Sequence, residues 1–141
     1  MIIVKEYTFD ECQLGLEESF DVLITEEIQQ KFKEITGDVN PMHVDKVYVQ
    51  SRGYKDVLVY GMCTASFYST LVGMYLPGKN ALLLGLDVQF PKPVYVGDKL
   101  TISGKIIERN EVYRRITIKA DIYNQDRKKV SRAKITVGVF E

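Results

Sequence analysis

Asp38 and His43 are the two residues whose types and spacing suit acid–base chemistry. They lie five positions apart in the segment Gly37-Asp38-Val39-Asn40-Pro41-Met42-His43. On a continuous helix that spacing would turn the two side chains about 140° apart. Proline keeps the preceding residue out of the helical region, and Asn and Asp favour turns, so we expect a tight irregular loop that can bring the pair together. A carboxylate beside an imidazole can move protons near neutral pH, and the two groups could share one water.

Both residues also have an ordinary structural reading, which the neighbouring sequence weakens. His43 could start a helix or lie in the core, and Asp38 could simply form a turn. However, the segment 36–43, Thr-Gly-Asp-Val-Asn-Pro-Met-His, resembles the signature loop of the MaoC-like, or R-specific enoyl-CoA hydratase, family. The resemblance extends through Gly53-Tyr54-Lys55, Tyr60-Gly61-Met62 and Phe90-Pro91-Lys92-Pro93-Val94 with Gly97-Asp98, and so spans most of residues 25 to 100.

This resemblance implies a fold, an assembly and an activity. The fold is a hot-dog fold, and the assembly is a homodimer with the active site near the subunit interface. The activity is hydration of trans-2-enoyl thioesters to R-3-hydroxyacyl thioesters, or the reverse dehydration, with the residues matching Asp38 and His43 as the catalytic pair. The chain departs from the family pattern at Tyr60, where histidine commonly precedes Gly-Met, and at Val49, where a small residue is usual. These departures concern substrate choice more than reaction type.

Such a reaction builds negative charge on the thioester carbonyl oxygen as an enolate forms. A backbone N–H at a helix N-terminus is a suitable donor, because the helix dipole favours negative charge there and glycine permits close approach. Gly61 opens an apolar segment that we predict to be helical, and it is our candidate for the oxyanion hole. A glycine needed only for the turn into the helix is the alternative, and both readings can hold together. We expect Asn40 and Pro41 to order the loop without touching substrate.

Other residues are open to more than one interpretation. Tyr60 could hydrogen-bond in the pocket, but an aromatic beside a buried helix is more often core, and we assign it no role. Cys63 could form a nucleophilic pair with His43, although a free cysteine is more often buried and inert. A set of basic residues could meet the phosphates of a carrier, although charge runs at hairpin ends are usually solvated. The set comprises Arg114, Arg115, Arg127, Lys128 and Lys129.

The expected substrate is an acyl-CoA or acyl carrier protein thioester, and the choice between these carriers stays open. Two rival functions remain: thioester hydrolysis, in which water attacks the carbonyl carbon, and a non-catalytic module that binds acyl thioesters. We predict no cofactor and no metal site, because one histidine and two distant cysteines make no ligand cluster and no nucleotide-binding glycine loop is present.

The elements that position these residues can be predicted from caps and periodicity. A helix should begin after Thr25, carry Ile28, Phe32 and Ile35 on one face, and stop at Gly37, just before the acid–base segment. A short helix should follow the loop and stop near Gly53. The segment 62–76 is apolar or small nearly all round, so we expect a helix surrounded by protein, whose slimmest face carries Met62, Ser66, Ser69 and Gly73.

From Pro77 onward the spacing switches to the alternation of strands. The first strand should place Leu82, Leu84, Leu86, Val88 and Phe90 on one side. Three more strands should follow, carried by Leu100, Ile102 and Ile106, by Ile116, Ile118, Ala120 and Ile122, and by Ala133, Ile135, Val137 and Val139. A long helix followed by an antiparallel meander predicts an α+β fold, with a curved sheet wrapped around the central helix.

Composition limits the setting of the protein. With 141 residues, 45% hydrophobic and 27% charged, residues 1–141 fit one domain. The 19 basic and 19 acidic residues cancel, which argues against nucleic acid or a membrane surface as a partner. The uncharged stretch 57–78 is too often interrupted by small polar residues for a membrane span. Two distant cysteines, and early charges at Lys5 and Glu6, favour a reduced, cytoplasmic protein without an export signal.

Overall fold

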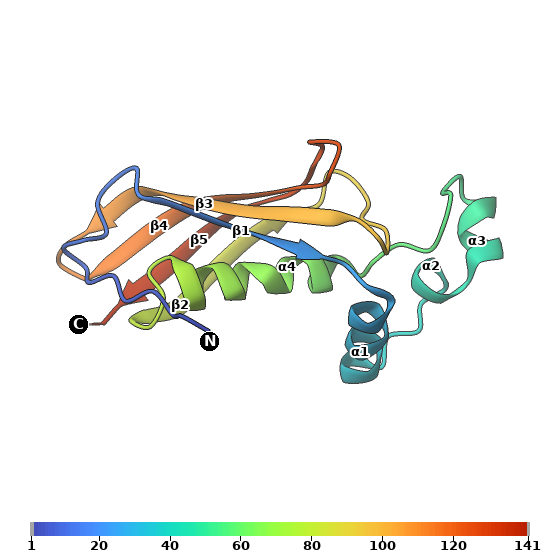
Figure 1. The fold of residues 1–141 in the computed structure, drawn as a ribbon, viewed down its shortest axis with the longest axis horizontal. Helices are drawn as coiled ribbons and strands as arrows, with labels where there is room; N and C mark the ends of the chain where they lie inside the picture. The colour runs from blue at the N-terminus through green and yellow to red at the C-terminus, as the bar shows by residue number, and fades with distance from the viewer. Residues whose placement is uncertain (1, 141) are drawn as a thin grey trace.

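The described part of the chain forms one strand, then the helices, and then four further strands (Figure 1). The computed structural model describes residues 2–140. Its elements are β1 (Glu17–Leu23), α1 (Glu26–Thr36), α2 (Pro41–Val44), α3 (Lys46–Ser51), α4 (Gly61–Thr70), a π-helical segment η1 (Leu71–Tyr75), β2 (Ala81–Gln89), β3 (Lys99–Asn110), β4 (Arg115–Tyr123) and β5 (Lys129–Val139).

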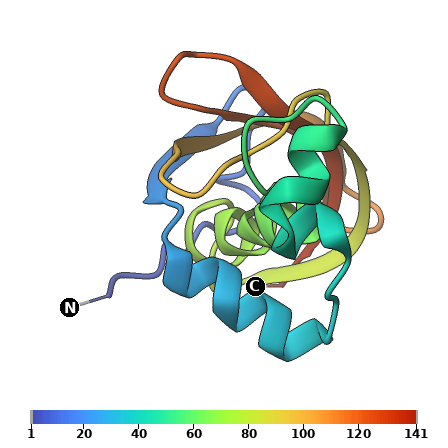
Figure 2. The ribbon, with the colours of Figure 1, turned by 90° about the vertical axis from the view of Figure 1, so that its right-hand side faces the viewer.

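Within residues 2–140, five strands form one antiparallel sheet in the order β1-β3-β4-β5-β2. The sheet curves around α4, while α1, α2 and α3 gather beyond the end where α4 begins (Figures 1 and 2). The predicted hot-dog architecture is confirmed. The predicted simple meander is wrong, because β2 pairs with β5 and the chain then crosses to β3 near the other edge. Alternation identifies a strand but does not specify its neighbour.

The core lies between α4 and the concave face of the sheet. All predicted inward residues of β3, β4 and β5 are buried there. The helical layer approaches closely at Gly104, where an added Cβ would lie 2.8 Å from Leu71 Cδ2 and 2.9 Å from Ile118 Cγ2. Only a residue without a side chain allows this distance, so Gly104 fixes the separation of helix and sheet.

The expectation that α4 is surrounded by protein is wrong for one face. The helix begins at Gly61, which was expected to open it. Its buried side carries Cys63, Thr64, Ala65 and Tyr68. The predicted slim face, which is the face of Met62, Ser66, Ser69 and Gly73, is instead exposed within the described residues. Because apolar and small residues occur all round this helix, their spacing does not indicate which side meets the sheet.

The prediction of a single apolar face on β2 is also wrong. A β-bulge at Leu83–Gly85 interrupts the strand. Before the bulge, Leu82 lies opposite Gly138 on the outer face, whereas after it Leu86 lies opposite the buried Ile135 on the inner face. One extra residue reverses the side on which later residues project. The leucines are therefore divided between the two faces of an edge strand.

The strand β1 was not predicted. Phe20 and Val22 turn toward the core, and Phe20 stacks on Tyr75 with ring centroids 4.8 Å apart. The acidic residues that alternate with them, including Asp21, are exposed. This alternation was the available signal. Among the described residues, no helix has the length and apolar character needed to cross a membrane.

Candidate active site

The helix α1 ends directly before Asp38, as predicted from its caps. The Thr25 hydroxyl accepts from the Ile28 N–H at 3.2 Å, and acidic residues occupy the first turn. Gly37 has a φ of 69° and donates its N–H to the Lys33 carbonyl at 2.8 Å. The left-handed conformation of Gly37 ends the helix, and Asp38, the candidate carboxylate, is the next residue.

A short run of side-chain to backbone bonds shapes the segment after α1. The Asp38 carboxylate accepts from the Asn40 N–H at 3.0 Å, and the Asn40 side chain accepts from the Met42 N–H at 2.9 Å. Asn40 thereby caps α2, which begins at Pro41. The prediction that the loop continues to His43 is wrong, since His43 lies inside this helix. An Asn cap followed by proline at the first helical position is itself a helix start.

The orientation of His43 is fixed by a main-chain carbonyl. Its Nδ1 lies 2.7 Å from the Leu58 oxygen. A carbonyl oxygen can only accept, so Nδ1 carries the proton and Nε2 of a neutral imidazole is left as an acceptor. The same oxygen also accepts from Gln29 Nε2 at 3.1 Å. Gln29 is 6% exposed on α1, and sequence reasoning did not single it out.

Tyr60 connects the two candidate catalytic residues. Its hydroxyl donates to the main-chain carbonyl of Asp38, and its ring stacks on the His43 ring with centroids 4.0 Å apart. Burial, and then the negative charge of Asp38, raise the pKa of Tyr60, which therefore keeps its proton and acts as a donor. Tyr60 was assigned no role from the sequence. Its departure from the family pattern, directly before Gly61, was the signal that could have identified it.

The structure brings Asp38, His43 and Gly61 to one cavity of about 280 Å³, which we call the acid–base cavity. Its lining also includes Phe32, Thr36, Tyr60, Met62 and Phe90. Gly61 is the first residue of α4, and the side chain of the N-cap residue, Tyr60, makes no capping bond. The first N–H groups of a helix have no acceptor within it, so they are available to a ligand. The cavity thus combines a carboxylate, an imidazole and a helix N-terminus.

Two further cavities adjoin the acid–base cavity through shared lining residues. The neighbouring cavity, of about 300 Å³, shares His43, Gly61 and Phe90 and adds Tyr54, Leu58, Val59, Thr64, Pro91, Lys92, Pro93, Val94 and Val130. The apolar cavity, of about 460 Å³, shares Phe32, Thr36 and Met62 and adds Ala65, Ser66, Tyr68, Ser69, Leu83 and Leu86. These three adjoining cavities suit an elongated ligand that has a reactive polar centre and an apolar chain.

Cys63 lies on the buried side of α4 and lines none of these three cavities. Burial raises the pKa of its thiol, so the unreactive thiol predominates at neutral pH. Both observations favour a packing role over a nucleophilic one. Within residues 2–140, no group of three or more His, Cys, Asp or Glu side chains is placed to hold a metal ion.

The basic residues considered for phosphate binding are divided between the two ends of the sheet. Arg114 and Arg115 lie at the β3–β4 hairpin, far from the start of α4 (Figure 1). Arg127 and Lys128 lie in the β4–β5 hairpin, and Lys129 begins β5 directly before Val130, which lines the neighbouring cavity. Only the second group is at the active-site end of the sheet.

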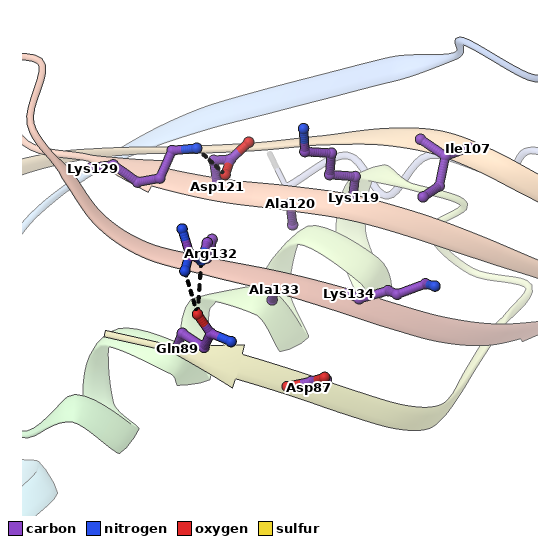
Figure 3. Close-up of a pocket in the computed structure, with 10 residues that line it drawn as sticks. All are labelled: Asp87, Gln89, Ile107, Lys119, Ala120, Asp121, Lys129, Arg132, Ala133 and Lys134. Carbon is purple, nitrogen blue, oxygen red and sulfur yellow. Dashed lines mark hydrogen bonds and ion pairs between the residues drawn. The ribbon is translucent and has the colours of Figure 1, made fainter. Parts of the chain in front are cut away.

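A separate groove of about 390 Å³ lies on the sheet over β2, β4 and β5 (Figure 3). Some of its polar side chains are engaged with one another. The Arg132 guanidinium donates to Gln89 Oε1 at 2.8 and 2.6 Å, and Lys129 pairs with Asp121 at 3.0 Å. None of the described residues predicted for catalysis lines this groove, so we place the candidate site at the start of α4.

Comparisons with known proteins show which proteins this chain is similar to. A profile of the MaoC-like domain matches residues 13–128. The (R)-specific enoyl-CoA hydratase of Aeromonas caviae is 33% identical over 94 residues, covering 67% of this chain and 70% of that protein. The enzyme of the same name from Rhodospirillum rubrum is 31% identical over 113 residues, covering 77% and 78%. The solved structure of an unliganded R-hydratase from Pseudomonas aeruginosa has a TM-score of 0.90 at 26% identity and covers 98% of this chain and 88% of that chain.

Proposed function

This chain belongs to the MaoC-like domain family, and on that premise we propose that it catalyses R-specific hydration of trans-2-enoyl thioesters to R-3-hydroxyacyl thioesters, or the reverse dehydration. The relatives named above are (R)-specific enoyl-CoA hydratases, and a further one is a 3-hydroxybutyryl-CoA dehydratase. The observation that carries the proposal is the meeting of Asp38, His43 and Gly61 at one cavity.

In the proposed reaction, the Asp38 and His43 side chains hold one water between them. The water oxygen bonds to the β carbon while the pair takes one of its protons, and the electrons of the double bond move to form an enolate. The Gly61 N–H stabilises the enolate oxygen, and the pair returns a proton to the α carbon. His43 is prepared for this role because its Nδ1–H is held by Leu58, which leaves Nε2 for the proton.

Turnover by the pure protein tests the proposal. We expect it to consume crotonyl-CoA and a longer enoyl-CoA, measured as loss of enoyl absorbance, and to yield R-3-hydroxyacyl-CoA on chiral analysis. Asp38→Asn and His43→Ala should each reduce turnover by about 10² to 10⁴-fold with unchanged circular dichroism. Asp10→Asn is the matched control, because Asp10 is exposed in the loop that packs near the β3–β4 hairpin at the opposite end of the sheet.

Two results would contradict this function, and a third would contradict the proposed mechanism. Release of free CoA thiol would indicate thioester hydrolysis, and unchanged acyl-CoA after long incubation would indicate a binding module. Full activity in both site variants would exclude the acid–base pair. Parallel assays with CoA and acyl carrier protein thioesters identify the carrier.

The proposal includes a homodimer. β2 is an edge strand among residues 2–140, and its backbone groups on one side face no other strand. Leu82 and Leu83 of this strand are each 46% exposed to solvent, and Met62 on the adjacent face of α4 is 62% exposed. A second copy would cover this surface. Because Met62 also lines the acid–base cavity, the site would lie beside the interface.

We further propose that residues 1–141 act as one domain in the cytoplasm. The strands and α4 share one core cluster in the described part of the chain, which supports the first point. Both cysteines are free and buried, which suits a reducing compartment.

A further inference from the structure

Thr64 is a buried polar residue that the proposed acid–base chemistry does not use. It lies in the first turn of α4, is 1% exposed, and lines the neighbouring cavity together with His43 and Gly61. Its hydroxyl oxygen has no hydrogen-bond partner in the part of the chain that the structure describes. Because an unpaired buried hydroxyl costs stability, its presence calls for a partner that binds there.

Two other hydroxyls on α4 are paired within the protein. Ser66 donates to the Cys63 carbonyl at 2.6 Å, and Tyr68 donates to the Ser131 hydroxyl at 2.9 Å. A helical threonine often bonds back to the carbonyl four residues earlier, which here belongs to Tyr60. Here the carbonyl of Tyr60 accepts the backbone N–H of Thr64 at 3.1 Å, as in any α-helix, and takes no bond from the hydroxyl. The Thr64 hydroxyl is thus free to bond to a ligand, whereas the hydroxyls of Ser66 and Tyr68 are already engaged.

The surroundings of Thr64 indicate which kind of group it would meet. The neighbouring cavity is lined close to it by apolar side chains, among them Val59, Val94 and Val130. A helix N-terminus in apolar surroundings favours an oxygen that carries negative charge. The thioester carbonyl is the group that gains such charge as the enolate forms.

We propose that the Thr64 hydroxyl is a second donor to the thioester carbonyl oxygen, acting beside the Gly61 N–H. This inference rests on the proposed hydratase function and adds a catalytic residue to its site. The backbone donor is fixed by the helix, whereas the hydroxyl can rotate to follow the oxygen as the carbonyl becomes an enolate. Two hydrogen-bond donors from one helical turn would stabilise the enolate more than a single donor would.

Thr64→Val tests this directly, because it replaces the hydroxyl by a methyl group of similar size. We expect kcat to fall about 10²-fold, as for loss of one oxyanion donor, with little change in KM. The midpoint of urea unfolding should stay equal or rise, since an unpaired buried hydroxyl is removed. Thr64→Ser retains the donor and should keep most of the activity. Thr70→Val, later in the same helix and outside the three cavities, should behave as wild type.

A spectroscopic measurement separates this inference from the proposed function. Cinnamoyl-CoA bound to a His43→Ala variant is not expected to turn over, and polarisation of its carbonyl should shift its absorbance to longer wavelength. Adding Thr64→Val should remove a large part of that shift. Unchanged kcat with an unchanged shift would overturn the role of Thr64, as would a change in KM alone. Absence of hydration by the wild-type protein would overturn the function, while the shift would still report on Thr64.

Discussion

Tyr60 is the residue through which the two halves of the candidate acid–base pair are held together. Its hydroxyl holds the main chain at Asp38, and its ring supports the ring of His43. Phe32 also contacts the Tyr60 ring, at a centroid distance of 5.1 Å. Acid–base catalysis depends on the relative position of the two groups. A residue that touches both therefore affects chemistry without itself exchanging a proton.

Tyr60→Phe should lower kcat about tenfold with a smaller effect on KM, because it keeps the ring contact but frees the Asp38 segment. The unfolding free energy should fall by about 1 kcal/mol, the value of one hydrogen bond. Steady-state kinetics on crotonyl-CoA and urea unfolding measure both effects. Tyr113→Phe, on the exposed β3–β4 hairpin, is the control. A Tyr60→Phe protein with wild-type kcat would show that its hydroxyl has no part in positioning.

At the scale of elements, the position of the helical layer against the sheet determines where the start of α4 lies. Gly104 on β3 allows Leu71, which directly follows α4, to approach the sheet closely. The same packing therefore places Gly61 and Thr64 at the cavities. A change at Gly104 would act on the site through displacement of the helix, because close-packed interiors transmit such shifts.

Gly104→Ala should destabilise the protein by about 1 to 3 kcal/mol, the usual cost of overpacking a core, and should reduce kcat by moving α4. Gly85→Ala is the matched control on β2, since its added Cβ would meet nothing closer than 3.8 Å. Urea unfolding of both variants compares their free energies of unfolding. Equal stability of the two variants would mean that the contact at Gly104 relaxes without cost.

At the scale of the whole molecule, the chain leaves an apolar surface along β2 and the open face of α4. Monomeric proteins rarely expose such an edge without charge or cover. The apolar cavity lies on this side, and Met62 and Leu83 are among its lining residues. A partner subunit there would close the cavity and enclose the acyl chain.

Sedimentation of the wild-type protein should give twice the mass of one chain. Leu83→Lys should shift it to the monomer and lower turnover, because a charge would be buried at the interface. Val112→Lys introduces the same charge at a residue that is 85% exposed on the distant hairpin, and should leave the dimer intact. A monomeric wild-type protein, or a dimeric Leu83→Lys protein, would contradict this arrangement.

The sequence by itself determined the parts of this protein that depend on neighbours a few residues away. Thr25 and Gly37 define α1 through bonds that span three and four residues, so its limits were predictable. Alternating residues likewise identified the buried faces of β3, β4 and β5. The turn at Asp38 to Asn40 was predictable because these side chains bond to their own backbone, whereas the helix that begins at Pro41 was not recognised.

Only the tertiary structure decided the contacts between residues distant in sequence. The bond from His43 to Leu58 spans 15 residues, and that from Tyr60 to Asp38 spans 22. The sequence also did not reveal the pairing of β2 with β5, the bulge in β2 or the unpaired hydroxyl of Thr64. Such contacts depend on how whole elements pack, because the free energy of packing is shared among many residues and is not recorded in any short segment.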